Sequence, residues 1–108
     1  MDFNEYQKAA ASTAIYPEEY KIIYTALGLA SEAGEVCGKV KKVLRDNSGV
    51  FTEEKKQAIA DEVSDCQWYV SNLLKDLDMS LDEAAKKNIA KLKSRQERGK
   101  LQGSGDDR

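Results

Sequence analysis

Two pairs of acidic side chains have the spacing of a metal-binding site. Glu32 and Glu35 are three residues apart in one helical segment, and Glu62 and Asp65 are three apart in the next. Residues at this spacing share one face of a helix. If the two helices pack antiparallel, the four carboxylates converge. Oxygen donors of this kind suit Mg²⁺, with Mn²⁺ as a second choice.

Converging carboxylates repel one another unless a cation lies between them. Two unit charges about 4 Å apart cost about 4 kcal/mol at an effective dielectric constant near 20. Mg²⁺ would remove that cost, and its other ligands are typically waters and substrate phosphates. The expected chemistry is metal-assisted transfer of a phosphoryl or nucleotidyl group to water. The alternative is an ordinary solvated surface, because Glu pairs at this spacing are common on exposed helices.

The composition excludes several other classes of protein. The chain has no histidine, so a di-iron bundle built on Glu-x-x-His pairs is excluded. The net charge of −2 gives no attraction to a nucleic-acid polymer or an anionic membrane. No apolar run approaches the roughly 18 residues of a membrane span. No secretory signal is evident, and Cys37 and Cys66 resemble buried thiols of a reducing compartment, so we expect a cytoplasmic protein.

The acidic pairs must be positioned by helices, because apolar residues recur at a spacing near 3.6 throughout the chain. Capping residues predict where the helices begin: Asp2, Pro17, Thr52 and Ser80. The helices are expected to end near Ala14, Arg45, Leu77 and Arg98. Short connections favour antiparallel neighbours. The pattern therefore predicts one all-α, four-helix-bundle-like domain over residues 1–98 and a Gly-rich tail over residues 99–108.

Two features of these helices bear on the acidic pairs. One apolar stripe runs along the third helix and consists of Ile59, Val63, Cys66, Val70, Leu73 and Leu77. Glu62 and Asp65 flank this stripe, which predicts a half-buried position for both. Gly28 and Gly34 bracket the acids of the second helix, although glycine there costs about 1 kcal/mol relative to alanine. A close approach by another backbone or a ligand would offset that cost.

The fourth helix carries polar residues beside its apolar positions, which are Leu81, Ala85, Ile89 and Leu92. Asn88, Lys91 and Arg95 share one face. Asn88 either makes a buried structural hydrogen bond or orients a ligand or a metal-bound water. Lys91 and Arg95 either neutralise phosphate oxygens or are simply solvated.

Two further features have two interpretations each. The tail either is disordered or folds over a substrate, offering backbone N–H groups and the guanidinium of Arg108. Trp68 lies among polar residues on the face opposite the apolar stripe. We interpret it first as a subunit contact and second as a stacking platform for a nucleobase.

Three motifs in this order resemble the MazG-like nucleotide pyrophosphohydrolases. Residues 28–36 with Lys39, Lys41 and Lys42 resemble the first motif, and residues 61–69 resemble the second. Residues 88–92 with Arg95 resemble the third, phosphate-side motif. The end of the chain, residues 98–108, and the opening Glu5-Tyr6-Gln7 resemble those of a short, single-domain branch of this family. The chain departs from the pattern at Ser64, where many relatives have glycine, and no residue of the loop 46–52 can be assigned to base recognition.

The resemblance implies an all-α fold in which Glu32, Glu35, Glu62 and Asp65 bind Mg²⁺ and take part in catalysis. It implies hydrolysis of (deoxy)nucleoside triphosphates to the monophosphate and pyrophosphate, as in house-cleaning of the nucleotide pool. It also implies a homodimer or homotetramer. The substrate-binding residues that we expect are Lys39, Tyr69, Asn88, Lys91, Arg95 and Arg108. The alternatives are a non-catalytic helical interaction module and an enzyme similar to phosphoribosyl-ATP pyrophosphohydrolase.

Overall fold

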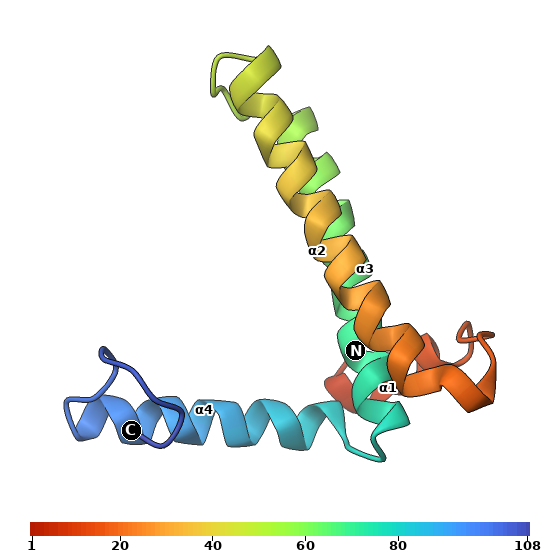
Figure 1. Ribbon diagram of the computed structural model, residues 1–108, viewed down its shortest axis with the longest axis vertical. Helices are drawn as coiled ribbons and strands as arrows, with labels where there is room; N and C mark the ends of the chain where they lie inside the picture. The colour runs from red at the N-terminus through yellow and green to blue at the C-terminus, as the bar shows by residue number, and fades with distance from the viewer.

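The computed structural model describes residues 1–108 and consists of helices and their connections. The helical elements in chain order are α1 (Phe3–Ala11), the 3-10 turn η1 (Glu18–Tyr20), α2 (Lys21–Asp46), α3 (Glu53–Asp76) and α4 (Leu81–Glu97). Helices α2 and α3 form a long antiparallel hairpin, α1 packs across its base, and α4 points away from it (Figure 1). The all-α prediction is confirmed. None of the helices combines the length and hydrophobicity needed to cross a membrane.

Side-chain caps start three helices where the sequence predicts them. The Asp2 carboxylate accepts from the Glu5 N–H at 2.8 Å, and the Glu5 side chain accepts in return from the Asp2 N–H at 3.4 Å. Thr52 Oγ1 accepts from the N–H of Lys55 at 3.2 Å. Ser80 Oγ accepts from the N–H of Glu83 at 3.2 Å, but Glu83 lies 3.9 Å from Lys86 instead of returning to Ser80.

The first connection differs from the prediction. Helix α1 ends at Ala11 and not near Ala14, because the N–H groups of residues 12–14 bond to the third residue back. The hydroxyls of Ser12 and Thr13 compete for the same carbonyls, at 2.6 and 3.1 Å, which favours turns over helix. Pro17 begins η1, and α2 starts only at Lys21.

Helix α1 and the segment that follows it cover a second face of α3, which carries polar residues. Ser71, Asn72 and Asp76 are all buried there. In contrast, Val63 and Leu77 of the predicted apolar stripe are 49% and 41% exposed. The prediction was therefore wrong for these positions, because it assigned α3 a single apolar face and could not show that α1 packs on a second one.

Buried polar groups hold α1, α3 and α4 together. The Tyr16 hydroxyl donates to the Asp76 carboxylate at 2.6 Å, and burial with this contact raises the pKa of Tyr16. The Thr25 hydroxyl lies 3.4 Å from the same carboxylate. The Gln7 amide donates to the carbonyls of Ser71 and Met79 and accepts from the N–H of Leu81. Gln7 therefore fixes the start of α4 relative to the base of the hairpin.

The contact between Gly28 and Tyr69 sets the closest approach of α2 and α3. A Cβ at Gly28 would lie 2.1 Å from a carbon of the Tyr69 ring. The predicted close approach at Gly28 is thus found, with a side chain as the neighbour. For Gly34 the prediction was wrong within the single chain, because nothing lies within 4 Å of a Cβ there.

The single chain does not close a compact bundle. Its radius of gyration is 16.9 Å, whereas a compact domain of this length has about 13 Å. It exposes 7883 Å² of surface, against about 6000 Å² for a typical folded monomer of 12.0 kDa. Ile89 and Leu92, which we expected to point inward, are 57% and 39% exposed because α4 extends beyond the hairpin.

The tail folds back on the end of α4, far from the hairpin (Figure 1). Arg95 is buried there and donates to the carbonyl of Asp106 at 2.6 Å. The Arg108 guanidinium donates to the carbonyls of Lys100, Leu101 and Gly105. Within one chain, therefore, the tail covers α4 and not the acidic residues.

Gly28→Ala should destabilise the protein by about 1–3 kcal/mol, because the new methyl group forces the Tyr69 ring out of its packed position. Denaturant-induced unfolding measures the change. Gly38→Ala is the matched control: open space surrounds that position, so the substitution should be neutral or should stabilise the helix by up to about 1 kcal/mol. Equal effects of the two substitutions would contradict this account.

Tyr16→Phe should lower the free energy of unfolding by about 1.5–3 kcal/mol, because the buried Asp76 carboxylate loses its shortest hydrogen bond. Thermal and denaturant unfolding test this. Tyr20→Phe removes a hydroxyl from an exposed tyrosine and should leave stability unchanged. A neutral effect of Tyr16→Phe would show that the contact with Asp76 does not hold α3 to the segment after α1.

Candidate functional site

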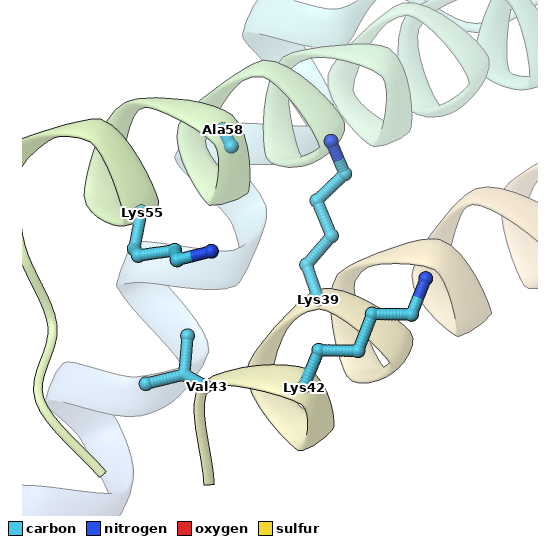
Figure 2. Close-up of a pocket in the computed structure, with 5 residues that line it drawn as sticks. All are labelled: Lys39, Lys42, Val43, Lys55 and Ala58. Carbon is cyan, nitrogen blue, oxygen red and sulfur yellow. The ribbon is translucent and has the colours of Figure 1, made fainter. Parts of the chain in front are cut away.

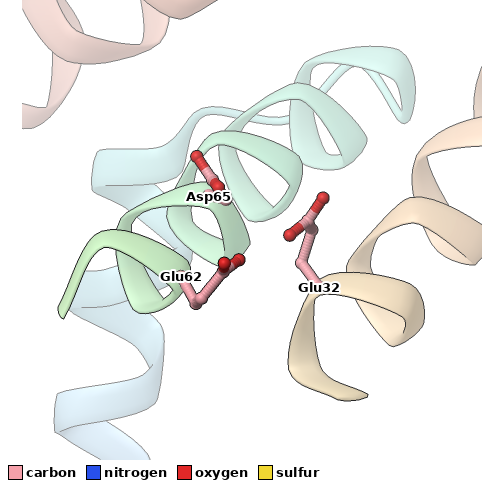
Figure 3. Close-up of side chains that lie close together, drawn as sticks. All are labelled: Glu32, Glu62 and Asp65. Atoms are coloured by element: carbon pink, nitrogen blue, oxygen red, sulfur yellow. The ribbon is translucent and has the colours of Figure 1, made fainter. Parts of the chain in front are cut away.

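One side of the α2–α3 hairpin carries a basic cavity next to an acidic cluster. The cavity has a volume of about 240 Å³ and is called here the lysine pocket; it is lined by Lys39, Lys42, Val43, Lys55 and Ala58 (Figure 2). The acidic group lies closer to the middle of the hairpin and is called the carboxylate cluster; it consists of Glu32, Glu62 and Asp65 (Figure 3).

The carboxylate cluster joins side chains from both helices of the hairpin. One oxygen from each carboxylate lies within 4.8 Å of the others, with Glu32 on α2 facing the two acids on α3 (Figure 3). Glu32 and Glu62 are half-buried and Asp65 is exposed. The half-buried position predicted for Glu62 is therefore found, whereas Asp65 lies further out. The structure brings three of the four predicted carboxylates together.

Glu35 is exposed and lies outside this cluster. The negative charge of Glu35 nevertheless raises the pKa of the Glu32 carboxyl, although it is the smallest of the causes that do so. Burial is the largest cause of this rise, followed by the contact with Glu62 and the charge of Asp65. The raised pKa of Glu32 shows that crowding of negative charge opposes its ionisation when no cation is present.

The carboxylate cluster has one positively charged side chain beside it. Lys39 Nζ lies 3.3 Å from a carboxylate oxygen of Glu62, so it links the lysine pocket to the carboxylate cluster. Glu62 is the only cluster member that forms an ion pair. A single ammonium group cannot neutralise three carboxylates, and the hard oxygen donors that remain suit a divalent cation.

Tyrosines border the cluster on the side away from the lysine pocket. The pKa of Tyr69 is raised mainly by burial and by the neighbouring Tyr24, and the charges of Glu32 and Asp65 add to the rise. Tyr6 of α1 also lies close enough for Asp65 to raise its pKa, after the larger effect of burial. Tyr6 and Tyr24 were not identified from the sequence, since no spacing pattern linked them to the acids.

Cys66 lies behind the cluster and is not suited to nucleophilic chemistry. Burial raises the pKa of its thiol, and the three cluster carboxylates raise it further. A thiol that stays protonated is a poor nucleophile. The prediction of two buried thiols was nevertheless wrong, because Cys66 is only half-buried and Cys37 is exposed on α2.

Trp68 packs within its own chain. Its indole N–H donates to Thr13 Oγ1 at 2.9 Å, and its ring meets those of Tyr16 and Tyr69 edge-on, with centroids 6.4 and 4.9 Å away. The polar face that we inferred around Trp68 is covered by the segment that follows α1. A role in subunit contact or base stacking stays a prediction.

The predicted phosphate-side residues lie on a different part of the molecule. Asn88 and Lys91 are exposed on α4, and Arg95 is buried under the tail. Because α4 points away from the hairpin (Figure 1), these residues and Arg108 do not meet the carboxylate cluster of the same chain.

Comparison with known proteins gives a consistent result. The profile of the MazG nucleotide pyrophosphohydrolase domain matches residues 22–99, a range that begins at α2 and contains the carboxylate cluster and the lysine pocket. The chain is also 44% identical over 114 residues to the Gene 37 protein of Mycobacterium phage L5, and the alignment covers 100% of both chains. No solved structure matches the chain.

Glu32→Gln should raise the melting temperature in metal-free buffer at pH 7, because it removes one of the crowded charges. The folded-state pKa of Glu32 lies above its ordinary value of 4.5, so apo stability should fall as the pH rises through that interval. The difference between variant and wild type should close well below pH 4.5, where the carboxyl is protonated in both states. Glu54→Gln, at an exposed position in the first turn of α3, is the control and should show no such difference.

Proposed function

The chain belongs to the MazG nucleotide pyrophosphohydrolase family, and from this premise we propose that it hydrolyses (deoxy)nucleoside triphosphates to the monophosphate and pyrophosphate with Mg²⁺. The observation that carries the proposal is the convergence of Glu32, Glu62 and Asp65 from two helices to within 4.8 Å. Removal of non-productive triphosphates from the nucleotide pool is the biological role that we associate with this reaction.

The residues present fit a divalent metal. Glu32, Glu62 and Asp65 supply oxygen donors only, which Mg²⁺ prefers and Mn²⁺ accepts. We retain Glu35 in the proposed metal and catalytic site, because its charge already acts on Glu32 from one turn along α2. When bound, the metal supplies Lewis-acid stabilisation of phosphate oxygens and lowers the pKa of a bound water.

Several side chains of the protein would activate the water and hold the substrate. The cluster carboxylates orient the attacking water and accept its proton. Lys39, which contacts Glu62, would neutralise phosphate oxygens beside the cluster. Tyr69 would border the nucleoside, because it lies against α2 next to Glu32 and Asp65.

A neighbouring copy of the chain would complete the site. Asn88, Lys91, Arg95 and Arg108 lie too far from the hairpin of their own chain to contact its substrate. The surface exposed beyond that of a compact monomer is about 1900 Å², from 7883 Å² observed against about 6000 Å² expected. That excess on one chain is about twice the area of roughly 800 Å² that each partner contributes to a typical specific interface. Exposed Ile89 and Leu92 would supply apolar area to a homodimer or homotetramer.

The wild-type protein should release pyrophosphate from at least one member of a panel of canonical dNTPs and NTPs, and the release should require Mg²⁺. Glu62→Gln should lower the rate at least about 100-fold, because it removes a metal ligand at the centre of the cluster. Glu54→Gln should retain wild-type activity, since that carboxylate is exposed and remote from the cluster.

Thermal unfolding with Mg²⁺ separates the enzyme from a non-catalytic interaction module. A metal that binds only the folded cluster raises the melting temperature of the wild type, and Glu62→Gln reduces that rise. No hydrolysis of the panel together with no response to Mg²⁺ would favour the interaction module. No hydrolysis with a clear response would point to a modified nucleotide as substrate.

A further inference from the structure

The lysine pocket is a concave basic site built by the two helices of the hairpin. Val43 forms its floor and is only 1% exposed. Lys39 reaches from α2 toward α3, and Lys55 reaches from α3 back toward α2 (Figure 2). The volume of about 240 Å³ has room for several waters or a small anion.

Two of the three lysines in this pocket lack a carboxylate partner. Lys39 pairs with Glu62, whereas neither Lys42 nor Lys55 forms an ion pair. The charges of Lys55 and Lys42 do act on Asp46, but the pKa of that carboxyl is lowered first by its bond with Arg45. Arg45 holds both Asp46 oxygens at 2.9 Å. The pocket therefore holds two ammonium groups, those of Lys42 and Lys55, that form no ion pair with a side chain.

The pocket lies in line with the carboxylate cluster along the hairpin. Lys39 and Lys42 follow Glu32 by seven and ten residues on α2, about 10–15 Å at 1.5 Å per residue. On α3, Lys55 precedes Glu62 by seven residues, about 10 Å. Long lysine side chains can bridge much of that distance, as the contact of Lys39 with Glu62 demonstrates.

We propose that the lysine pocket binds the terminal phosphates of the substrate and retains the pyrophosphate that leaves, with Lys42 and Lys55 as its direct ligands. This inference rests on the proposed function, because it assigns the direction in which the triphosphate chain lies in that same site. The reacting phosphate lies at the carboxylate cluster, and the terminal phosphates point toward the loop between α2 and α3. The nucleoside then lies toward Tyr69 and Tyr24, on the opposite side of the cluster.

Lys39 couples the two halves of this arrangement. In the absence of a metal, its ammonium group is held by Glu62. If Glu62 held a divalent cation, Lys39 would lose this partner and its ammonium group could serve the terminal phosphates as a third positive charge. Lys39 would then make the binding of metal and of phosphates cooperative.

The test is calorimetric titration of the full-length protein with inorganic pyrophosphate in EDTA-containing buffer. We expect the double variant Lys42→Ala/Lys55→Ala to raise the dissociation constant at least about fivefold. The matched control is Lys41→Ala/Lys56→Ala, which removes the same charge from neighbouring positions of α2 and α3 that do not line the pocket. The control should change the dissociation constant less than about twofold, since neither residue lines the pocket and Lys56 already pairs with the exposed Glu53.

Two outcomes would overturn the inference: absence of pyrophosphate binding by the wild type, or equal weakening in the two double variants. Circular dichroism checks that both variants stay folded. The test does not depend on turnover, so it is distinct from the test of the proposed function. If the nucleotide panel is hydrolysed but the pocket variants bind pyrophosphate as the wild type does, only the pocket assignment fails.

Discussion

The packing of Tyr69 against the bare backbone of Gly28 is the contact on which the candidate site depends. It fixes the register of the α2–α3 hairpin, since a methyl group at residue 28 would overlap the ring. Glu32 follows Gly28 by four residues on α2, and Asp65 precedes Tyr69 by four residues on α3. Lys42 follows Glu32 by ten residues on α2, and Lys55 precedes Asp65 by ten residues on α3. One close helix–helix contact thus brings first the acids and then the lysines level with each other.

Charges of opposite sign lie next to each other along this hairpin, although the whole chain has a net charge of only −2. Burial, and after it the neighbouring acids, raise the pKa of Glu32, while Lys42 and Lys55 of the pocket have no ion-pair partner. The like charges within the carboxylate cluster repel one another, and so do those within the lysine pocket. Both would be relieved together by a divalent cation and a phosphate chain, which carry the complementary charges. This complementarity is the physical basis of the proposed chemistry on nucleoside triphosphates.

The incomplete fold and the incomplete site have a common origin in the direction of α4. Gln7 fixes the start of this helix at the base of the hairpin, and the rest of α4 extends into solvent. Its apolar residues Ile89 and Leu92 are left without a core, and Lys91 is exposed and away from the carboxylate cluster. A second copy of the chain would address both deficits, because the same helix would bury apolar surface and carry its cations to another hairpin.

The sequence by itself determined the all-α class, the approximate helix boundaries and the identity of the acids, because capping, helical spacing and motif order are local properties. It also pointed to Gly28, since a glycine inside a helix has a cost that some contact must offset. Only the tertiary structure decided that Glu35 lies outside the cluster, that the segment after α1 packs against Trp68 and the buried Asp76, and that Lys42 and Lys55 share a pocket. These facts depend on which helix faces meet and at what register, and α1 and α4 have short amphipathic patterns compatible with more than one packing partner.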